Sequence, residues 1–390
     1  MSELKVNSIK GVGASTAAIT VNNTDGTCTA NITNNLSNRN LIINGAMQVA
    51  QRGTSSTSTG YQTVDRFFTY HNGTDEAPTY SQANVSSGTT PYTLGFRKSF
   101  KITNGNQTGG AGTADQLTVH YPIEAQDIAN SGWNYTSSSS YITLSFWIKS
   151  SVAQDFKGFI KTEDGTEKSY PFATGSLSAD TWTKVTKSIS GDSGLTFDNN
   201  VNKGFEITWS AYLGTDVTGS VTENAWMTWS GSTRTADQTS TWYTTNDATL
   251  EITGVQLEVG TVATDFEHKT YNQEIALCGR YYQRLISTAN YKALGIGFAY
   301  NGSTIQLSFP YPLGKMRTSP SIDAVTGADY WKVEGGGVTL NVDGSWVAEH
   351  STDTQMSFYG VPDGTLSTVG LSHYVRSNNN AAMFSFSAEL

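Results

Sequence analysis

Short hydrophobic runs, separated by turn-forming residues, follow one another along most of the chain. Between residues 40 and 266 they include FRKSFKIT, DQLTVHYPI, SYITLSFWIKS, WTKVTKSI, FEITWSAYL and ATLEITGVQLEVG. Strands of this length, with almost no helical periodicity between them, are typical of an antiparallel sandwich or jelly roll. In SYITLSFWIKS, Ile142, Leu144, Phe146 and Ile148 form one aliphatic face opposite a mixed one. That alternation predicts a strand with one buried face.

One segment has a helical pattern. Thr270 is followed three residues later by Gln273, which fits a capping box. An apolar stripe with three-four-three spacing comes next, formed by Ile275, Cys278, Tyr282 and Leu285. Two short heptads are too few for a free-standing coiled coil. We therefore expect a linking helix over residues 269–286, whose stripe packs on a sheet or meets its copies at a trimer axis.

The flanking segments differ in their capacity to form a core. Residues 287–390 again contain short strand-like hydrophobic runs, which predict one small C-terminal β domain. Residues 1–40 contain brief alternations, such as Ile19 and Val21, but few large apolar side chains. We expect residues 1–40 to be stabilised by another chain, either identical copies or a docking platform. The alternative is a flexible terminus. The predicted domains are thus 1–40, a jelly roll over 41–268, the helix over 269–286, and 287–390.

Composition narrows the classes of function. Only 15% of the residues are charged, the net charge is −9, and no basic run occurs, so nucleic acid is not an expected partner. No stretch is long and apolar enough to predict membrane insertion, and the amino end has no apolar signal region. Cys28 and Cys278 are far apart and lie outside any zinc-ligand spacing, which predicts neither a disulfide framework nor a zinc site.

A search for catalytic chemistry is mostly negative, and the chain is predicted not to be an enzyme. Nucleophile-elbow, zinc-protease and phosphate-loop motifs are absent, and the five histidines lack ligand spacing. Two carboxylates would suffice for glycoside hydrolysis, but the candidates mostly sit beside turn residues. These candidates are Asp65, Glu124, Asp127, Glu163, Asp164 and Asp192. No cofactor is expected, although a loop such as GTEDGTE or GDSG leaves a structural calcium ion open.

Aromatic residues in polar, turn-rich stretches are the candidate binding residues. They are Trp226, Trp229, Trp242 and Tyr243 in one stretch and Trp133 and Tyr135 in another. A flat ring with a polar fringe can support the C–H face of a sugar while amides and hydroxyls bind its edge. The alternative is that one or two of these rings fill the sandwich core at a strand end.

Several segments resemble virion appendage proteins of tailed bacteriophages, especially marine phages. In that family, tail-fibre-like receptor-binding proteins carry a jelly roll like that of carbohydrate-binding modules. The similar segments are NLIINGAMQVAQRG with VDRF, SFWIKSS, ITGVQLEVGTVATDFE, EIALCGRYYQRL and MRTSPSI, which together span most of residues 40–325. The resemblance implies a structural role for the matching residues, and no catalytic residue is carried over.

The resemblance implies a homotrimer whose N-terminal part binds other tail or capsid proteins of the virion and whose distal domain faces the host. We therefore expect a virion protein, assembled in the host cytoplasm, that attaches to bacterial surface glycan. Since the net charge is −9, neutral sugars fit better than lipopolysaccharide phosphates. Two alternatives remain: a structural capsid fibre or tail connector without its own receptor binding, and a polysaccharide depolymerase.

Overall fold

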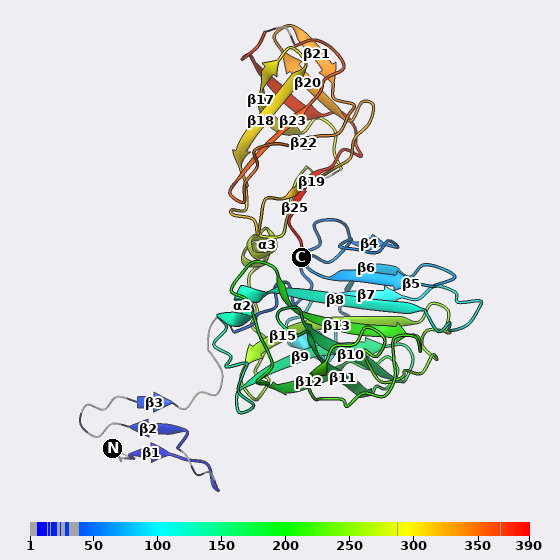
Figure 1. The fold of residues 1–390 in the computed structure, drawn as a ribbon, viewed down its shortest axis with the longest axis vertical. Coiled ribbons are helices and arrows are strands. Elements are labelled where there is room, and N and C mark those ends of the chain that lie inside the picture. Colours follow the sequence, from blue (N-terminus) through cyan, green and yellow to red (C-terminus); the bar gives the residue numbers. More distant parts are fainter. Residues whose placement is uncertain are drawn as a thin grey trace.

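The computed structural model describes residues 6–13, 15, 17–21, 24, 28–30, 39–286, 288–366 and 368–390. These residues form mostly antiparallel strands, which confirms the all-β fold class predicted from the sequence. Figure 1 shows three parts in chain order: a small N-terminal sheet, a large β-sandwich and a C-terminal β domain beyond a short helix. None of the described helices is long and apolar enough to cross a membrane.

The N-terminal sheet has three strands in the order β1-β2-β3. They are β1 (Ser8–Ile9), β2 (Ile19–Val21) and β3 (Cys28–Ala30). The predicted alternation at Ile19 and Val21 therefore lies in a strand. Val6, Ile9 and Val12 are exposed, so these three side chains are not part of a core within this chain. That another chain stabilises this segment stays a prediction.

The sandwich consists of two six-stranded antiparallel sheets. In spatial order, the first sheet contains β14 (Met227–Thr228), β11 (Lys168–Ser176), β10 (Asp155–Thr162), β13 (Lys203–Leu213), β8 (Gln116–Glu124) and β5 (Phe68–Asn72). The second contains β12 (Thr183–Ser190), β9 (Tyr141–Ser150), β15 (Thr249–Val259), β7 (Lys98–Thr103), β6 (Thr79–Asn84) and β4 (Ser55–Ser56). Two short helices, α1 (Thr90–Thr93) and α2 (Ala125–Ala129), lie in the connections.

The core lies between these two sheets. Phe146 of β9 meets Trp209 of β13 edge to face, with ring centroids 5.7 Å apart. The predicted aliphatic face of β9 is buried, with Ile142, Leu144 and Ile148 at most 1% exposed. The opposite face of β9 is also largely covered, because Thr143 and Ser145 on that side are buried as well. A jelly-roll sandwich therefore underlies most of the chain.

The predicted helix begins where expected but is shorter. Helix α3 (Tyr271–Cys278) has the capping box: the Gln273 amide donates to the Thr270 hydroxyl at 3.4 Å, and the Thr270 amide donates to the Gln273 side chain at 2.9 Å. Residues 282–286 were predicted to continue this helix, and that part was wrong. They form strand β16 (Tyr282–Ile286), because their backbone pairs with β25 (Phe384–Ser387), which is distant in sequence.

The C-terminal domain encloses a second aromatic core between two sheets. Its smaller sheet has the order β16-β25-β19, with β19 at Ser321–Ala324. The larger sheet contains, in order, β21 (Val338–Asn341), β20 (Trp331–Gly335), β24 (Ser372–Ser377), β17 (Ala293–Asn301), β18 (Thr304–Pro310), β23 (Gln355–Gly360) and β22 (Val347–Ala348). Trp331, Trp346, Phe358 and Phe384 pack against one another inside.

Buried ion pairs join the C-terminal domain to the sandwich. Arg66 donates to the carboxylate of Glu389, which also accepts from Arg52 at 3.1 Å. Glu124, at the end of β8, is fully buried and accepts two hydrogen bonds from Arg280, at 2.6 and 2.7 Å. Charged groups removed from water must be paired, so these contacts determine how the two domains meet.

Candidate functional site

The outer face of the first sheet carries the best candidate binding surface. Side chains directly opposite each other on neighbouring antiparallel strands point to the same face. Register places Phe68 of β5 beside His120 of β8, His120 beside Thr208 of β13, and Thr208 beside Phe159 of β10. This row of side chains crosses four strands, with a phenylalanine at each end and the polar His120 and Thr208 between them.

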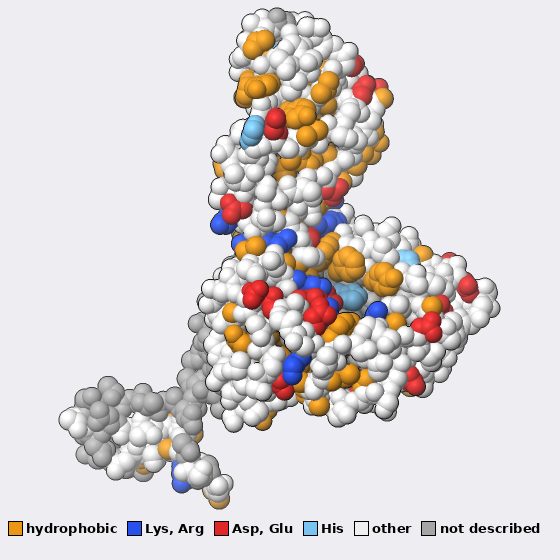
Figure 2. Space-filling model, in the orientation of Figure 1, with side chains coloured by type: hydrophobic (Ala, Val, Ile, Leu, Met, Phe, Trp, Pro, Cys, Tyr) orange, Lys and Arg blue, Asp and Glu red, His pale blue; other side chains and the backbone are white. Residues whose placement is uncertain are grey.

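Part of this face is open as a groove, which we call the β5–β8 groove, with a volume of about 370 Å³. That volume lies within the range of small-molecule sites. Figure 2 shows this face, with hydrophobic side chains gathered near β5 and charged side chains over β8 and β13. The lining residues are Tyr61, Phe68, Tyr70, Gln116, His120, Pro122, Lys203, Glu206, Arg234 and Leu390.

Aromatic rings form one wall of the groove. Tyr61 and Phe68 meet edge to face with centroids 5.2 Å apart, and Phe68 meets the ring of His120 at 5.8 Å. The Tyr61 hydroxyl donates to the carbonyl of Leu390 at 3.1 Å, and burial raises the pKa of this phenol. Tyr70, on the same face of β5, is 36% exposed. Rings that are fixed by such contacts offer a flat apolar surface to a ligand, and binding costs them little conformational entropy.

Hydrogen-bonding groups form the opposite wall. Glu206 accepts from Lys203 at 2.9 Å and lies 3.0 Å from Nδ1 of His120. The Arg234 guanidinium donates to the side-chain oxygen of Gln116 at 2.9 Å. The charges of Lys203 and Glu206 therefore compensate each other, whereas Arg234, whose partner Gln116 is neutral, keeps its positive charge beside the rings.

The charge of Glu206 is stabilised by its partners. Burial on its own would raise the pKa of this carboxyl, but the hydrogen bond and charge of His120 and the charge of Lys203 outweigh it. They lower the pKa from 4.5 to about 2. Glu206 is thus ionised in the folded protein at all but the most acidic pH.

This shift predicts a pH-dependent stability. A lowered pKa in the folded state stabilises the protein above the unfolded value of 4.5, and the contribution is lost as pH falls towards 2. Between about pH 5 and 2, we expect the wild type to lose about 3 kcal/mol more unfolding free energy than Glu206→Gln. Urea unfolding at each pH measures this difference. Equal pH slopes for the two proteins would contradict the assignment.

Three of the aromatic residues proposed from the sequence as sugar platforms are core residues instead. Trp242 and Tyr243 are 0% exposed and Trp133 is 3% exposed. The Trp242 indole N–H donates to the carbonyl of Thr249 at 3.0 Å, and Tyr243 stacks on Tyr212 at 4.4 Å. These rings fill space between the sheets, because burying a large apolar ring outweighs the polar character of the loop around it. The sugar-platform interpretation was wrong for these three.

The other three are half-buried and lie outside the groove. Trp226 donates its N–H to the carbonyl of Ser190 at 2.7 Å, and Tyr135 packs edge to face on Phe197. Trp229 covers the outward-facing Phe159 at 5.3 Å. It also lies 5.9 Å from the guanidinium of Arg234, a groove residue. Trp229 therefore supports the side of the groove without lining it.

Sequence reasoning missed the groove residues themselves. In VDRFFTY, Phe67 is buried whereas Phe68 and Tyr70 point outward, as strand alternation requires. Two outward-facing aromatic side chains two residues apart were therefore a detectable signal. Their partners on β8 and β13 come from distant segments, and no local pattern connects them.

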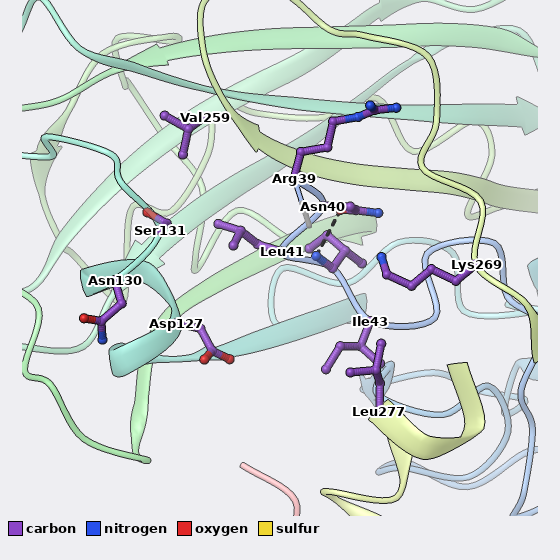
Figure 3. Close-up of a pocket in the computed structure, with 11 residues that line it drawn as sticks. Arg39, Asn40, Leu41, Ile43, Asp127, Asn130, Ser131, Val259, Lys269 and Leu277 are labelled. Atoms are coloured by element: carbon purple, nitrogen blue, oxygen red, sulfur yellow. Dashed lines mark hydrogen bonds between the residues drawn. The ribbon is translucent and has the colours of Figure 1, made fainter. Parts of the chain in front are cut away.

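A second hollow, of about 460 Å³, lies where the chain enters the sandwich. Figure 3 shows Asp127 of α2 and Asn130, the residue after this helix, on one side and Leu277 of α3 near Ile43 on the other. Burial and the charge of Glu124 raise the pKa of Asp127 to about 6. The apolar lining residues of this hollow are aliphatic, so it lacks the flat rings of the β5–β8 groove.

The carboxylates weighed as catalytic candidates have structural partners in most cases. Asp65 accepts from Gln51, and Glu163 and Asp192 pair with lysines at 3.0 and 2.6 Å. Among the described residues, no three His, Cys, Asp or Glu side chains are close enough together to hold a metal ion. The prediction that the chain is not an enzyme is not tested by these contacts.

Comparison with known proteins leaves the family open. No protein-family model matches the sequence, and no curated protein does either. A putative sugar-binding protein from Bacteroides thetaiotaomicron has a TM-score of 0.30 and 14% identity, over 56% of this chain and 99% of that one. The tandem CBM22 domains of Paenibacillus barcinonensis Xyn10C have a TM-score of 0.29 and 11% identity, over 93% of this chain and 100% of that one.

A phage protein is also among the similar structures. The enzymatically active domain of tailspike protein 4 from bacteriophage CBA120 has a TM-score of 0.30 and 12% identity. The match covers 56% of this chain but only 21% of that one. With TM-scores this low, these similarities do not decide the function.

Proposed function

We propose that this protein is a virion appendage protein, of the tail-fibre type, that attaches to bacterial surface glycan through the β5–β8 groove. The observation that carries the proposal is the pairing of aromatic and polar walls in one groove. Phe68 and Tyr70 offer apolar faces, while Gln116 and Arg234 offer an acceptor and donors within the same space. A sugar ring requires both kinds of contact at once.

Paired charges favour a neutral sugar. Lys203 and His120 are both directed to Glu206, so none of these three presents an uncompensated charge to a ligand. The chain as a whole carries a net charge of −9, which disfavours phosphate-rich glycans. We therefore propose a neutral polysaccharide as the ligand class.

We further propose that the protein works as a homotrimer, joined to other tail or capsid proteins of the virion through residues 1–40. Threefold repetition would make weak glycan sites effective, because later contacts become intramolecular and gain effective concentration. Sedimentation velocity of the full chain tests the trimer, and imaging of labelled virions tests the location. A position on the capsid instead of the tail would contradict the tail-fibre assignment.

The glycan site is tested by truncating its rings. Phe68→Ala and Tyr70→Ala remove flat surface from the groove, and both side chains point away from the core. We expect each to weaken binding to host cells or to a positive glycan-array spot about tenfold, equivalent to roughly 1.4 kcal/mol. Tyr271→Ala is the matched control, since Tyr271 is 54% exposed on α3 and lies outside the groove.

Two results would count against the site. If the wild type binds no surface glycan, the adhesive function fails. If both groove variants bind like the wild type, the glycan site lies elsewhere. Unchanged thermal unfolding midpoints in all three variants are needed to exclude a folding defect.

A purely structural connector is the second candidate, and the domain junction favours it. Arg317 donates to the carbonyls of Val201 in the sandwich and of Ala388 and Glu389 in the C-terminal domain, at 2.7 to 3.0 Å. Such cross-domain contacts suit a rigid spacer. A connector would be needed for virion assembly but not for adsorption, so Phe68→Ala particles would then adsorb normally.

A simple assay distinguishes the third candidate, a depolymerase, from a protein that only binds polysaccharide. We propose that the protein binds polysaccharide without cleaving it. Incubation with host capsule polysaccharide is therefore expected to release no new reducing ends. Release by the wild type would overturn the non-enzymatic assignment.

A further inference from the structure

One exposed sheet face in the C-terminal domain is unusually apolar. On β17, Ile296, Phe298 and Tyr300 alternate outward and are 71%, 41% and 60% exposed. Tyr374 of the neighbouring β24 lies directly opposite Ile296 and is 41% exposed. We call these four side chains the β17 face. Figure 1 places β17 and β18 side by side in this domain.

Charge is nearly absent from the centre of this face. The strands β17, β18 and β23, with sequences ALGIGFAYN, TIQLSFP and QMSFYG, contain no charged residue. Charged residues lie at the border, where Glu334 is opposite Tyr374 and accepts from Arg376, and Lys332 is opposite Arg376. A solvated face of an antiparallel sheet normally carries polar or charged side chains.

The size of the β17 face fits an interface. Large aromatic side chains contribute roughly 150–250 Å² each. At the exposures of these four residues, the apolar area is roughly 400 Å², comparable with the largest patch found on ordinary monomers. It is also about half of the ~800 Å² that each partner buries in a standard interface. The polar residues around it, such as Gln306 opposite Phe298, would supply the rim.

The chemistry of the β17 face favours a second copy of this chain as the occupant. Cores of protein interfaces are rich in Tyr and Phe and poor in charge, as this face is. Copies with a net charge of −9 repel one another, so they approach most favourably through surfaces free of charge. The most exposed member, Ile296, is aliphatic. A sugar platform would require flat rings there.

We propose that copies of this chain associate through the β17 face. Its residues are distinct from those of the β5–β8 groove, so the assignment does not depend on glycan binding. In a closed symmetric assembly, the same face of every copy is buried. The outward alternation of Ile296, Phe298 and Tyr300 then serves assembly, while the inward side chains of β17 serve the fold.

The experiment is sedimentation velocity of the full chain at micromolar concentration. The wild type is expected to sediment at a multiple of 42.0 kDa. Phe298→Glu and Ile296→Lys place a charge on the β17 face without altering the core, and each is expected to raise the dissociation constant at least about 30-fold. Leu94→Glu is the matched control, because Leu94 is 49% exposed in the sandwich. It should associate like the wild type.

The outcomes separate this proposal from the proposed trimer. A trimer lost in both variants but kept in the control supports both proposals. A dimer lost in the same way supports the β17 face and contradicts the trimer. Association that resists both substitutions overturns the β17 face, and so does a wild type that stays monomeric. If that monomer loses host adsorption through Phe298→Glu, the face binds the receptor instead.

Discussion

Replacing Arg66 with methionine is expected to lower the free energy of unfolding by about 3–5 kcal/mol. The Arg66 guanidinium is 1% exposed and donates to Glu389 and to the carbonyl of Pro122 at 2.8 Å. It also stacks on the ring of Tyr281, with 3.4 Å between the guanidinium carbon and the ring centroid. Methionine keeps much of the volume but leaves the Glu389 carboxylate with less compensation. The domain junction should therefore weaken first.

Lys315→Met is the matched control for this prediction. Lys315 pairs with Asp353 at 2.8 Å, but the two side chains are 60% and 36% exposed. Exposed pairs contribute at most about 1 kcal/mol, because water screens them. Urea unfolding of both variants measures the contrast. Similar losses in the two would mean that the Arg66 pair is no more important than a surface contact.

Trp242→Ala is expected to cost a similar amount, about 3–5 kcal/mol. The indole of Trp242 is 0% exposed and meets the ring of Phe156 edge to face at 6.2 Å. Truncation leaves a cavity between the sheets and the carbonyl of Thr249 without the indole N–H that bonds to it. The cost of the cavity and the cost of the lost hydrogen bond add, because a rigid sandwich closes such a cavity only in part.

Trp229→Ala provides the comparison, since Trp229 is half-buried on the outer face. Its loss should cost clearly less stability than the loss of Trp242. Thermal unfolding reports stability, and glycan binding is measured on the same samples. A Trp242→Ala protein that keeps its stability but loses glycan binding would restore the original sugar-platform interpretation.

Local patterns were sufficient for the elements themselves. Alternation at Ile142, Leu144 and Phe146 identified β9, and the capping box at Thr270 located the start of α3. Both features depend only on neighbours in the chain: side-chain alternation in a strand, and hydrogen bonds within one helical turn. Local patterns did not predict the end of α3, because the backbone of Tyr282 pairs with β25, which lies more than a hundred residues later.

The burial of aromatic side chains is a feature that local sequence patterns did not predict. Trp229 and Trp242 lie in one polar stretch, yet one covers an outer face and the other is in the core. Composition around the two rings is similar, so only packing decides which is buried. Conversely, Phe68 was not predicted as a site residue, because its polar neighbour His120 lies on a paired strand distant in sequence and Thr208 lies one strand further.

Local sequence patterns predict the all-β class, the sandwich with its aliphatic strand faces and the capped helix, and composition shows the scarcity of charge. These follow from side-chain periodicity and local hydrogen bonding, which neighbours in the chain establish. Tertiary structure alone decided which rings fill the core, which line the β5–β8 groove and which form the β17 face. Those outcomes depend on strand register and on the solvent removed when distant segments meet, and neither is contained in any short stretch of residues.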